Sequence, residues 1–240
     1  MIISFIQSYL QGADITDIVI FALLSVTALL FSLTVHEFAH GWMAKKCGDD
    51  TAYMNGRLTL NPVAHLDPIG AISLLFVGYG WAKPVPVNLR NLRKPKRDIA
   101  LVSLAGPVSN IIIALVTSVI YTAVDVLLPV TRFTIILSAA FYITAILNVG
   151  LAIFNLIPLP PLDGSKVLAC LLPGRVAAKY LMWERYFYIF MLIMILGNRI
   201  PVVGDIIDFL WLPVDLVKDA IIFAFSEPFY LLWSLLRSLF

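Results

Sequence analysis

The feature that most constrains this chain is an apolar run over residues 18–44, whose only charge is that of Glu37. At 1.5 Å per helical residue, the run is long enough to cross about 30 Å of hydrocarbon. It ends at Lys45 and Lys46, the first basic residues of the sequence. The run therefore predicts a membrane-spanning helix that carries a glutamate.

The composition extends this expectation to the whole chain. Hydrophobic residues make up 60% of the 240 residues and charged residues 13%, whereas soluble domains have about 45–50% and about 25%. The length suits one membrane domain with several spans. The two cysteines, Cys47 and Cys170, indicate neither a disulfide framework nor a cysteine-based zinc site.

Two further apolar runs, over residues 99–124 and 133–157, predict a second and a third span. The apolar segment 71–81 is too short to cross as a helix and is bounded by glycines, so we expect a re-entrant or β-like hairpin there. The predicted fold class is an all-α polytopic membrane protein. It has a three-helix core, this hairpin and additional C-terminal membrane helices.

Basic residues are distributed unevenly between the predicted spans. Nine lysines and arginines lie between Lys45 and Arg97 and four between Lys166 and Arg185, but the short turn 125–132 has only one. The positive-inside rule then places the ends of the first and third spans on the cytoplasmic side, at the same depth. The basic loop 83–97 is expected to face anionic lipid, and no nucleic-acid partner is expected.

The pattern H-E-x-x-H lies near the end of the first span, as His36, Glu37 and His40. Residues four apart share one helix face, so both imidazoles can bind one metal ion, and Glu37 can reach a water beside it. Simple packing of these polar side chains between helices is the weaker alternative. A glutamate at this depth costs about 2.5 kcal/mol or more and indicates a functional site.

A catalytic zinc ion usually has three protein ligands, so the pattern needs a third. His65 and Asp67 in "NPVAHLDP" are candidates, and so is Asp163 in "PLPPLDGSK". The prolines before Asp163 prevent a regular helix, and irregular backbone at membrane depth is tolerated where it is buried in protein or lines a wet cavity. This favours Asp163, with His65 as the alternative.

"HEFAH" in the first span, paired with "FNLIPLPPLDGSKV" after the third, resembles the site-2 protease family of intramembrane zinc metalloproteases. The similarity extends through "NPVAHLDPIG", "GWAKPVPVN" and "LAGPVSN" and covers residues 33–167. It implies that His36, His40 and Asp163 hold one Zn²⁺ per chain and that Glu37 is the general base. It also implies that Asn155 steadies the scissile carbonyl oxygen; the alternative is an amide that caps the third span.

The resemblance is to a short, compact subgroup without PDZ or CBS modules. It implies a metalloendopeptidase that cleaves peptide bonds within or near transmembrane segments, by attack of a zinc-bound water assisted by glutamate. The expected partners are a transmembrane protein substrate and the lipid bilayer, while the oligomeric state is open. The expected location is a prokaryotic plasma membrane, with the active site toward the cytoplasm.

The expected organisation is an interfacial segment over residues 1–17, a catalytic membrane core over 18–167 and C-terminal membrane or interfacial helices over 168–240. Segment 71–81 and the following "KPVPVN" are either an edge strand that receives an extended substrate or a packing hairpin. His65 is expected near the site, without an assigned role.

Other functions remain possible at this point. One alternative is a catalytically inactive scaffold or regulator of the same fold, although the complete set of motif residues counts against it. Another is a metal or proton transporter, although the second span has no acidic residue or histidine over residues 99–124. An enzyme that cleaves prenylated or soluble peptides is the nearest enzymatic alternative.

Overall fold

The computed structural model describes residues 12, 14–77, 80–186, 189, 220, 223–224 and 227–235. Within this part of the chain, three helices are long and apolar enough to cross a membrane: α2 (Ile15–Lys46), α5 (Pro95–Leu127) and α6 (Arg132–Leu156). They contain the three predicted spans almost completely. The chain is therefore an all-α, multi-pass membrane protein. Most of the predicted interfacial segment 1–17 lies outside the described residues.

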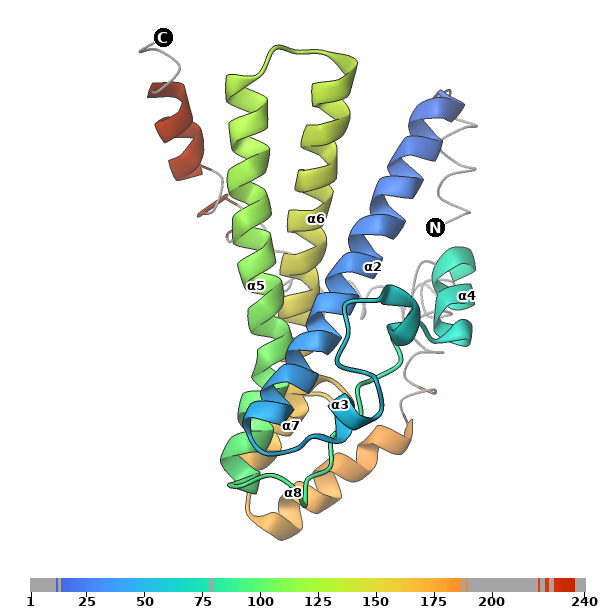
Figure 1. The fold of residues 1–240 in the computed structure, drawn as a ribbon, viewed down its shortest axis with the longest axis vertical. Helices are drawn as coiled ribbons and strands as arrows, with labels where there is room; N and C mark the ends of the chain where they lie inside the picture. The colour runs from blue at the N-terminus through green and yellow to red at the C-terminus, as the bar shows by residue number, and fades with distance from the viewer. Residues whose placement is uncertain are drawn as a thin grey trace, which may run out of the picture.

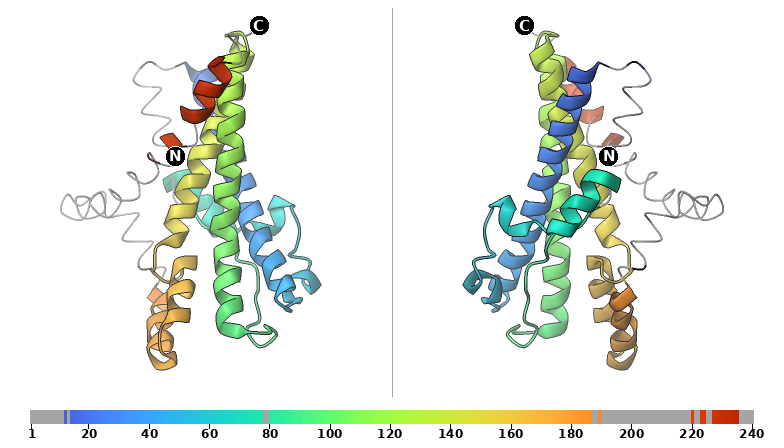
Figure 2. Two further views of the ribbon diagram at one scale, coloured as in Figure 1. Left: turned by 90° about the vertical axis from the view of Figure 1, so that its left-hand side faces the viewer. Right: turned by 90° about the vertical axis from the view of Figure 1, so that its right-hand side faces the viewer.

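The three long helices form the body of the molecule (Figure 1). Helices α5 and α6 are antiparallel neighbours, and α2 packs against both near its C-terminal end. Toward its N-terminal end, α2 leans away from the other two. Of the short helices, those over residues 51–54, 163–171 and 174–181 lie at the opposite end of the molecule, whereas the helix over residues 68–77 lies beside the middle of α2 (Figures 1 and 2).

Local signals explain where the long helices begin and end. The Asp14 side chain accepts a hydrogen bond from the Thr16 N–H and caps α2, while Lys45 and Lys46 complement the dipole of its last turn. Helix α6 begins with a capping box formed by Thr131 and Thr134. Four residues, 128–131, connect α5 to α6, which is short enough to force an antiparallel pair.

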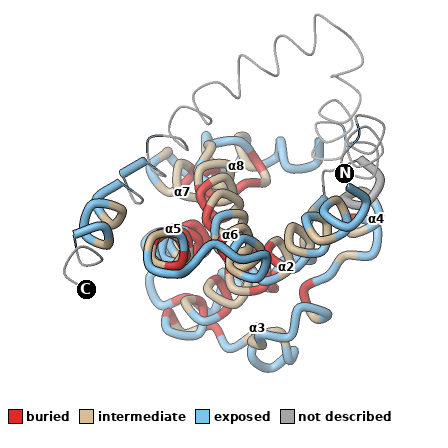
Figure 3. Tube along the Cα trace, turned by 90° about the horizontal axis from the view of Figure 1, so that it is seen from above, coloured by how far each residue is buried: buried red, intermediate tan, exposed pale blue. Residues whose placement is uncertain are grey.

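The contacts between the long helices are made by small and polar residues. The buried positions lie where α2, α5 and α6 meet (Figure 3), whereas large apolar side chains such as Phe31 and Ile112 point outward. Small interface residues let membrane helices approach closely, because lipid is as apolar as the side chains that face it. The buried side chains of this kind include Ser32, Gly106, Asn110, Ala114, Thr122, Ala145, Asn148 and Ala152.

The segment between α2 and α5 contains α3 (Thr51–Met54), η1 (Pro62–His65) and α4 (Pro68–Val77). For segment 71–81, the β-like alternative is wrong for residues 71–77, which are helical; the re-entrant alternative stays a prediction. The continuous apolar sequence suits a helix that buries its own backbone groups. Among the described residues of this segment, one antiparallel bridge, Leu66 to Ala82, brings the two ends of the segment together. Residues 83–88 are not in a strand.

After α6 the chain forms α7 (Asp163–Leu171), α8 (Gly174–Leu181) and η2 (Met182–Tyr186). Helix α7 packs against α5, and α8 lies across the end of the molecule (Figure 1). The C-terminal helices expected beyond Arg185 lie mostly outside the described residues.

A buried carboxylate connects two loops at this end. Asp49 is fully buried and accepts hydrogen bonds from the hydroxyl and N–H of Thr51, the N–H of Asn88 and the side-chain amide of Asn91. Burial alone raises the pKa of Asp49, but these donors outweigh it and hold the pKa below its ordinary value of 3.8. The segment that follows α4 is thus fixed against the end of α2.

Candidate metal centre

Helix α2 places His36 and His40 one turn apart on its buried face. Their rings meet edge to face, with centroids 4.6 Å apart. The two Nε2 atoms are 3.0 Å from each other. The spacing of the H-E-x-x-H pattern therefore brings two ring nitrogens to one point, as the helical period requires.

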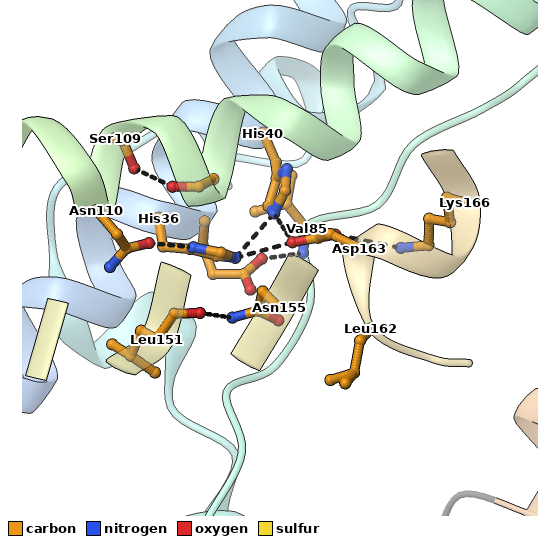
Figure 4. A network of polar contacts seen from close by, with 12 residues as sticks. His36, His40, Val85, Ser109, Asn110, Leu151, Asn155, Leu162, Asp163 and Lys166 are labelled. Carbon is orange, nitrogen blue, oxygen red and sulfur yellow. Dashed lines mark hydrogen bonds and ion pairs between the residues drawn. The ribbon is translucent and has the colours of Figure 1, made fainter. Parts of the chain in front are cut away.

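Helix α7 brings a carboxylate to the same point. Asp163 is the first residue of α7 and is buried. Its Oδ2 lies 3.2 Å from His36 Nε2 and 3.1 Å from His40 Nε2 (Figure 4). Its other oxygen, Oδ1, is 3.8 Å from Lys166 Nζ. The next residue is Gly164, where a Cβ would clash with the Leu156 carbonyl, so α7 can begin directly beneath the end of α6.

Helix α5 supports both imidazoles from behind. Val102 O accepts a hydrogen bond of 2.7 Å from His40 Nδ1, and the Asn110 side-chain oxygen contacts His36 Nδ1. Between them lies Gly106, where a Cβ would stand 2.5 Å from both His36 Cε1 and His40 Nε2. With each Nδ1 occupied on the α5 side, both Nε2 atoms turn toward Asp163.

The chemistry of these three atoms fits a zinc ion. Zinc bonds of about 2.0–2.2 Å at tetrahedral angles separate ligand atoms by about 3.3–3.6 Å, and the three contacts, at 3.0, 3.1 and 3.2 Å, are slightly shorter than this separation. A neutral imidazole that donates from Nδ1 offers a lone pair at Nε2. Two such lone pairs and a carboxylate oxygen, all buried, are three acceptors that one bound cation would satisfy together.

The two other predicted catalytic residues lie beside this group. One carboxylate oxygen of Glu37, Oε2, accepts a 2.8 Å hydrogen bond from the Val85 N–H. Asn155 donates from its side-chain amide to Leu151 O at 3.0 Å, which is the helix-end interaction that the sequence left as the alternative. Figure 4 shows Asn155 near the end of α6, close to the histidines and Asp163.

The remaining candidates for a third ligand lie in other contacts. His65 is buried and donates from Nε2 to Thr59 O at 2.9 Å, and Asp67 accepts from the Gly70 N–H in the first turn of α4. In the described part of the chain, the group of three or more potential ligands within mutual reach is His36, His40 and Asp163. The structure therefore brings together the favoured set and leaves His65 and Asp67 out of it.

The residues that support this group from α5 and from the segment after α4 were not predicted from the sequence. Gly106 and Asn110 stand four residues apart in "LAGPVSN", so a shared helix face was readable from their spacing. Val102 and Val85 contribute a backbone carbonyl and a backbone N–H, and a residue's type does not reveal such a role. Their roles appear only once the helices are placed.

Fold and site together define a multi-pass membrane protein with a candidate metal centre of two histidines and one aspartate between its helices. Comparison with known proteins adds its class. The chain matches the sequence profile of peptidase family M50 over residues 129–197. It is 41% identical over 206 residues to "Putative zinc metalloprotease YwhC" of Bacillus subtilis, covering 85% of this chain and 91% of that protein.

Two more distant relatives also have names that include "zinc metalloprotease". "Putative zinc metalloprotease Rip2" of Mycolicibacterium smegmatis is 31% identical over 156 residues, which are 61% of this chain and 56% of that protein. "Zinc metalloprotease MJ0392" of Methanocaldococcus jannaschii is 25% identical over 164 residues, 68% of this chain and 39% of that protein. No solved structure matches the chain at a significant level.

The chain belongs to peptidase family M50, the site-2 protease family. It is accordingly a metalloprotease, and its cofactor is Zn²⁺.

Proposed function

We propose that this protein is an intramembrane zinc protease that hydrolyses peptide bonds within or near the transmembrane segments of other membrane proteins. His36, His40 and Asp163 hold the zinc ion. The observation that supports this most directly is the convergence of their three ligand atoms within 3.2 Å of one another, buried between α2, α5 and α7. When bound, zinc supplies a Lewis acid that polarises a carbonyl and makes water acidic enough to attack it near neutral pH.

Glu37 is the general base of this reaction. It follows His36 directly, so its carboxylate reaches the vicinity of the ligand atoms without joining them. The Val85 N–H holds Oε2 at 2.8 Å, which leaves Oε1 to take the proton of the attacking water and to return it to the leaving amine. Val85 stands between Pro84 and Pro86. Because proline has no N–H, Val85 carries the single backbone donor of this triplet.

Asn155 stabilises the negative charge that develops on the substrate carbonyl. Its amide now donates to Leu151 O, a bond within its own helix, and a rotation about χ1 and χ2 frees it for a substrate oxygen. Donors of this kind contribute about 10²–10³-fold to the rate. The role is supported by the position of Asn155 at the end of α6, beside the candidate metal centre (Figure 4).

The site faces the cytoplasm in a prokaryotic plasma membrane. The basic residues near the α2 C-terminus and in the segment before α5 gather at the end of the molecule that carries α3, α7 and α8, and positively charged segments remain on the cytoplasmic side. The candidate metal centre lies nearer to this end than to the α5–α6 turn. Water and substrate therefore reach it from the cytoplasmic side.

The direct test compares wild type and Glu37→Gln, purified in detergent, for zinc content and for cleavage of a fusion protein with one transmembrane helix. We expect about one zinc ion per chain in both proteins and about 10²–10⁴-fold slower cleavage in the variant, as for the loss of a general base. Equal cleavage by the two proteins would contradict the role of Glu37. Cleavage of a soluble peptide but not of the membrane substrate would contradict the intramembrane reaction.

A further inference from the structure

A buried chain of side-chain hydrogen bonds leads away from the candidate metal centre into the membrane-spanning part of the molecule. Asn110 on α5 contacts His36 at Nδ1 and donates from its amide to Asn148 Oδ1 on α6 at 2.7 Å. Asn148 in turn donates to Ser32 Oγ on α2 at 2.7 Å. These four side chains are at most 4% exposed. This series of hydrogen bonds therefore connects all three spans without contact with solvent.

The direction of every link is fixed by backbone carbonyls, which can only accept. The Asn148 amide also donates to Thr144 O at 2.8 Å, so its nitrogen faces Thr144 and Ser32, and its oxygen faces Asn110. The Ser32 hydroxyl donates to Ala28 O at 2.6 Å, which leaves Ser32 Oγ as the acceptor. The two amides thus have one orientation each that satisfies every partner.

The donor–acceptor order of these hydrogen bonds also determines the tautomer of His36. Because Asn148 Oδ1 accepts, Asn110 must present its nitrogen to Asn148 and its oxygen to His36. An amide oxygen cannot donate, so His36 Nδ1 carries the proton, and neutral His36 keeps a lone pair at Nε2. His40 reaches the same tautomer by another route, because its Nδ1 donates to the Val102 carbonyl.

We infer that Asn110 is a positioning residue for the metal centre: it fixes the proton of His36 on Nδ1, and Asn148 and Ser32 fix the orientation of Asn110. This inference rests on the proposed role of His36 as a zinc ligand. The outer partner of a ligating histidine orients its ring and tunes its affinity for the metal. In lipid, where no water can replace a missing partner, the orientation must come from other groups of the protein.

The two histidines consequently differ in how they respond to substitution. The acceptor of His40 is a backbone carbonyl, which survives any change of the Val102 side chain. The acceptor of His36 is the Asn110 side chain, and its orientation depends on two more residues. Zinc affinity should therefore be sensitive to substitutions at 110 and 148, even though neither residue can touch the metal ion.

The test measures zinc affinity of the full-length protein in detergent by competition with a chromophoric chelator. Asn110→Leu should bind zinc about 10–100-fold more weakly than wild type, the effect usual for such outer partners. Asn148→Leu should weaken zinc binding by a smaller factor. Without Asn148, the Asn110 side-chain amide can flip and present either its oxygen or its nitrogen to His36. Thr117→Val is the matched control: Thr117 is a buried α5 residue whose hydroxyl bonds to carbonyls of its own helix, and its affinity should equal that of wild type.

Asn110→Asp separates positioning from folding. The carboxylate keeps an acceptor for His36 but loses the donor to Asn148. This variant should therefore melt at a lower temperature than wild type and yet bind zinc more tightly than Asn110→Leu. All melting temperatures are measured with excess chelator, so that zinc does not stabilise any variant. If Asn110→Leu does not fold, the comparison of Asn148→Leu with Thr117→Val carries the test.

His36→Ala distinguishes the failure of this inference from that of the proposed function. If His36→Ala binds zinc as wild type does, His36 is not a ligand, and the proposed centre is wrong. If His36→Ala loses zinc but Asn110→Leu and Asn148→Leu bind it as wild type does, the centre stands and the positioning role of Asn110 is wrong. Equal zinc affinities of Asn110→Asp and Asn110→Leu would also overturn the inference.

Discussion

Each imidazole of the candidate metal centre is held by α5, and the space between them depends on a missing side chain. Gly106 lies behind both rings, where a Cβ would stand 2.5 Å from His36 Cε1 and 2.5 Å from His40 Nε2. Real Cβ atoms do not approach so closely, so any larger residue must displace α5 or the two rings. The glycine is thus a requirement of the ligand geometry.

At this scale we predict that Gly106→Ala lowers zinc content and slows cleavage at least tenfold. Displacement of both imidazoles moves the ligand atoms away from Asp163, and small misplacements of reacting groups cause rate losses up to about 10². Gly150→Ala on α6 is the matched control, because a Cβ there meets nothing within 4 Å. Zinc analysis and cleavage assays of both variants check the prediction, which is wrong if the two behave alike.

Some residues of the site can be predicted from the sequence and others cannot. Helical spacing alone puts His36 and His40 on one face, and the irregular, proline-rich backbone at membrane depth favours Asp163 over His65 as the third ligand. The contact between Glu37 and Val85 could not be predicted, since it joins a side chain to a backbone N–H across 48 residues of separation. Backbone donors carry no residue signature.

Among the connecting elements, the segment after α4 is held to the end of α2 by Asp49. Donors from Thr51, Asn88 and Asn91 surround this carboxylate. The same segment carries Val85, whose N–H bonds to Glu37. Loop structure at this end therefore bears on the position of the proposed general base.

The depressed pKa of Asp49 predicts a pH-dependent stability. A carboxylate whose folded pKa lies below its unfolded value of about 3.9 stabilises the fold above that value and loses this contribution as the pH falls through the folded pKa. Asp49→Asn should unfold more readily than wild type by about 1–3 kcal/mol at pH 7, and the difference should shrink below about pH 4. Thermal unfolding in detergent at pH 7, 5 and 3 measures it; a gap that widens in acid would contradict this account.

Elements differed in how well the sequence predicted them. The three spans followed from run length and charge, because the thickness of the bilayer leaves few alternatives. Segment 71–81 was harder, since a short, continuously apolar run has no periodicity that separates helix from strand. Its first seven residues are helical in α4. The sequence also left open whether Asn155 caps its helix or faces the site, a choice that depends on side-chain rotation.

The molecule as a whole is polarised along its long axis, with α3, α7 and α8 at one end and the α5–α6 turn at the other (Figures 1 and 2). Most of the basic residues belong to the segments at the first of these ends. This arrangement predicts the side of the membrane that each end faces. In a background with Cys47→Ala and Cys170→Ala, cells carrying Val130→Cys should react with a membrane-impermeant thiol reagent. Cells carrying Met54→Cys should react only after permeabilisation.

Both positions are highly exposed, at 86% for Val130 and 81% for Met54, so a difference in labelling reports the side of the membrane. Labelling of Met54→Cys in intact cells, with none at Val130→Cys, would invert the orientation. The candidate metal centre would then face away from the cytoplasm.

His36, His40 and Asp163, from α2 and α7, are the proposed zinc ligands, and the number of zinc ions bound per chain shows whether they are. We predict about one zinc ion in wild type and in His65→Ala, and a loss of zinc in His36→Ala, His40→Ala and Asp163→Ala, each purified in detergent and checked for folding. Zinc retained by Asp163→Ala but lost from His65→Ala would contradict the account, because the third ligand would then be the histidine that the structure leaves outside the group.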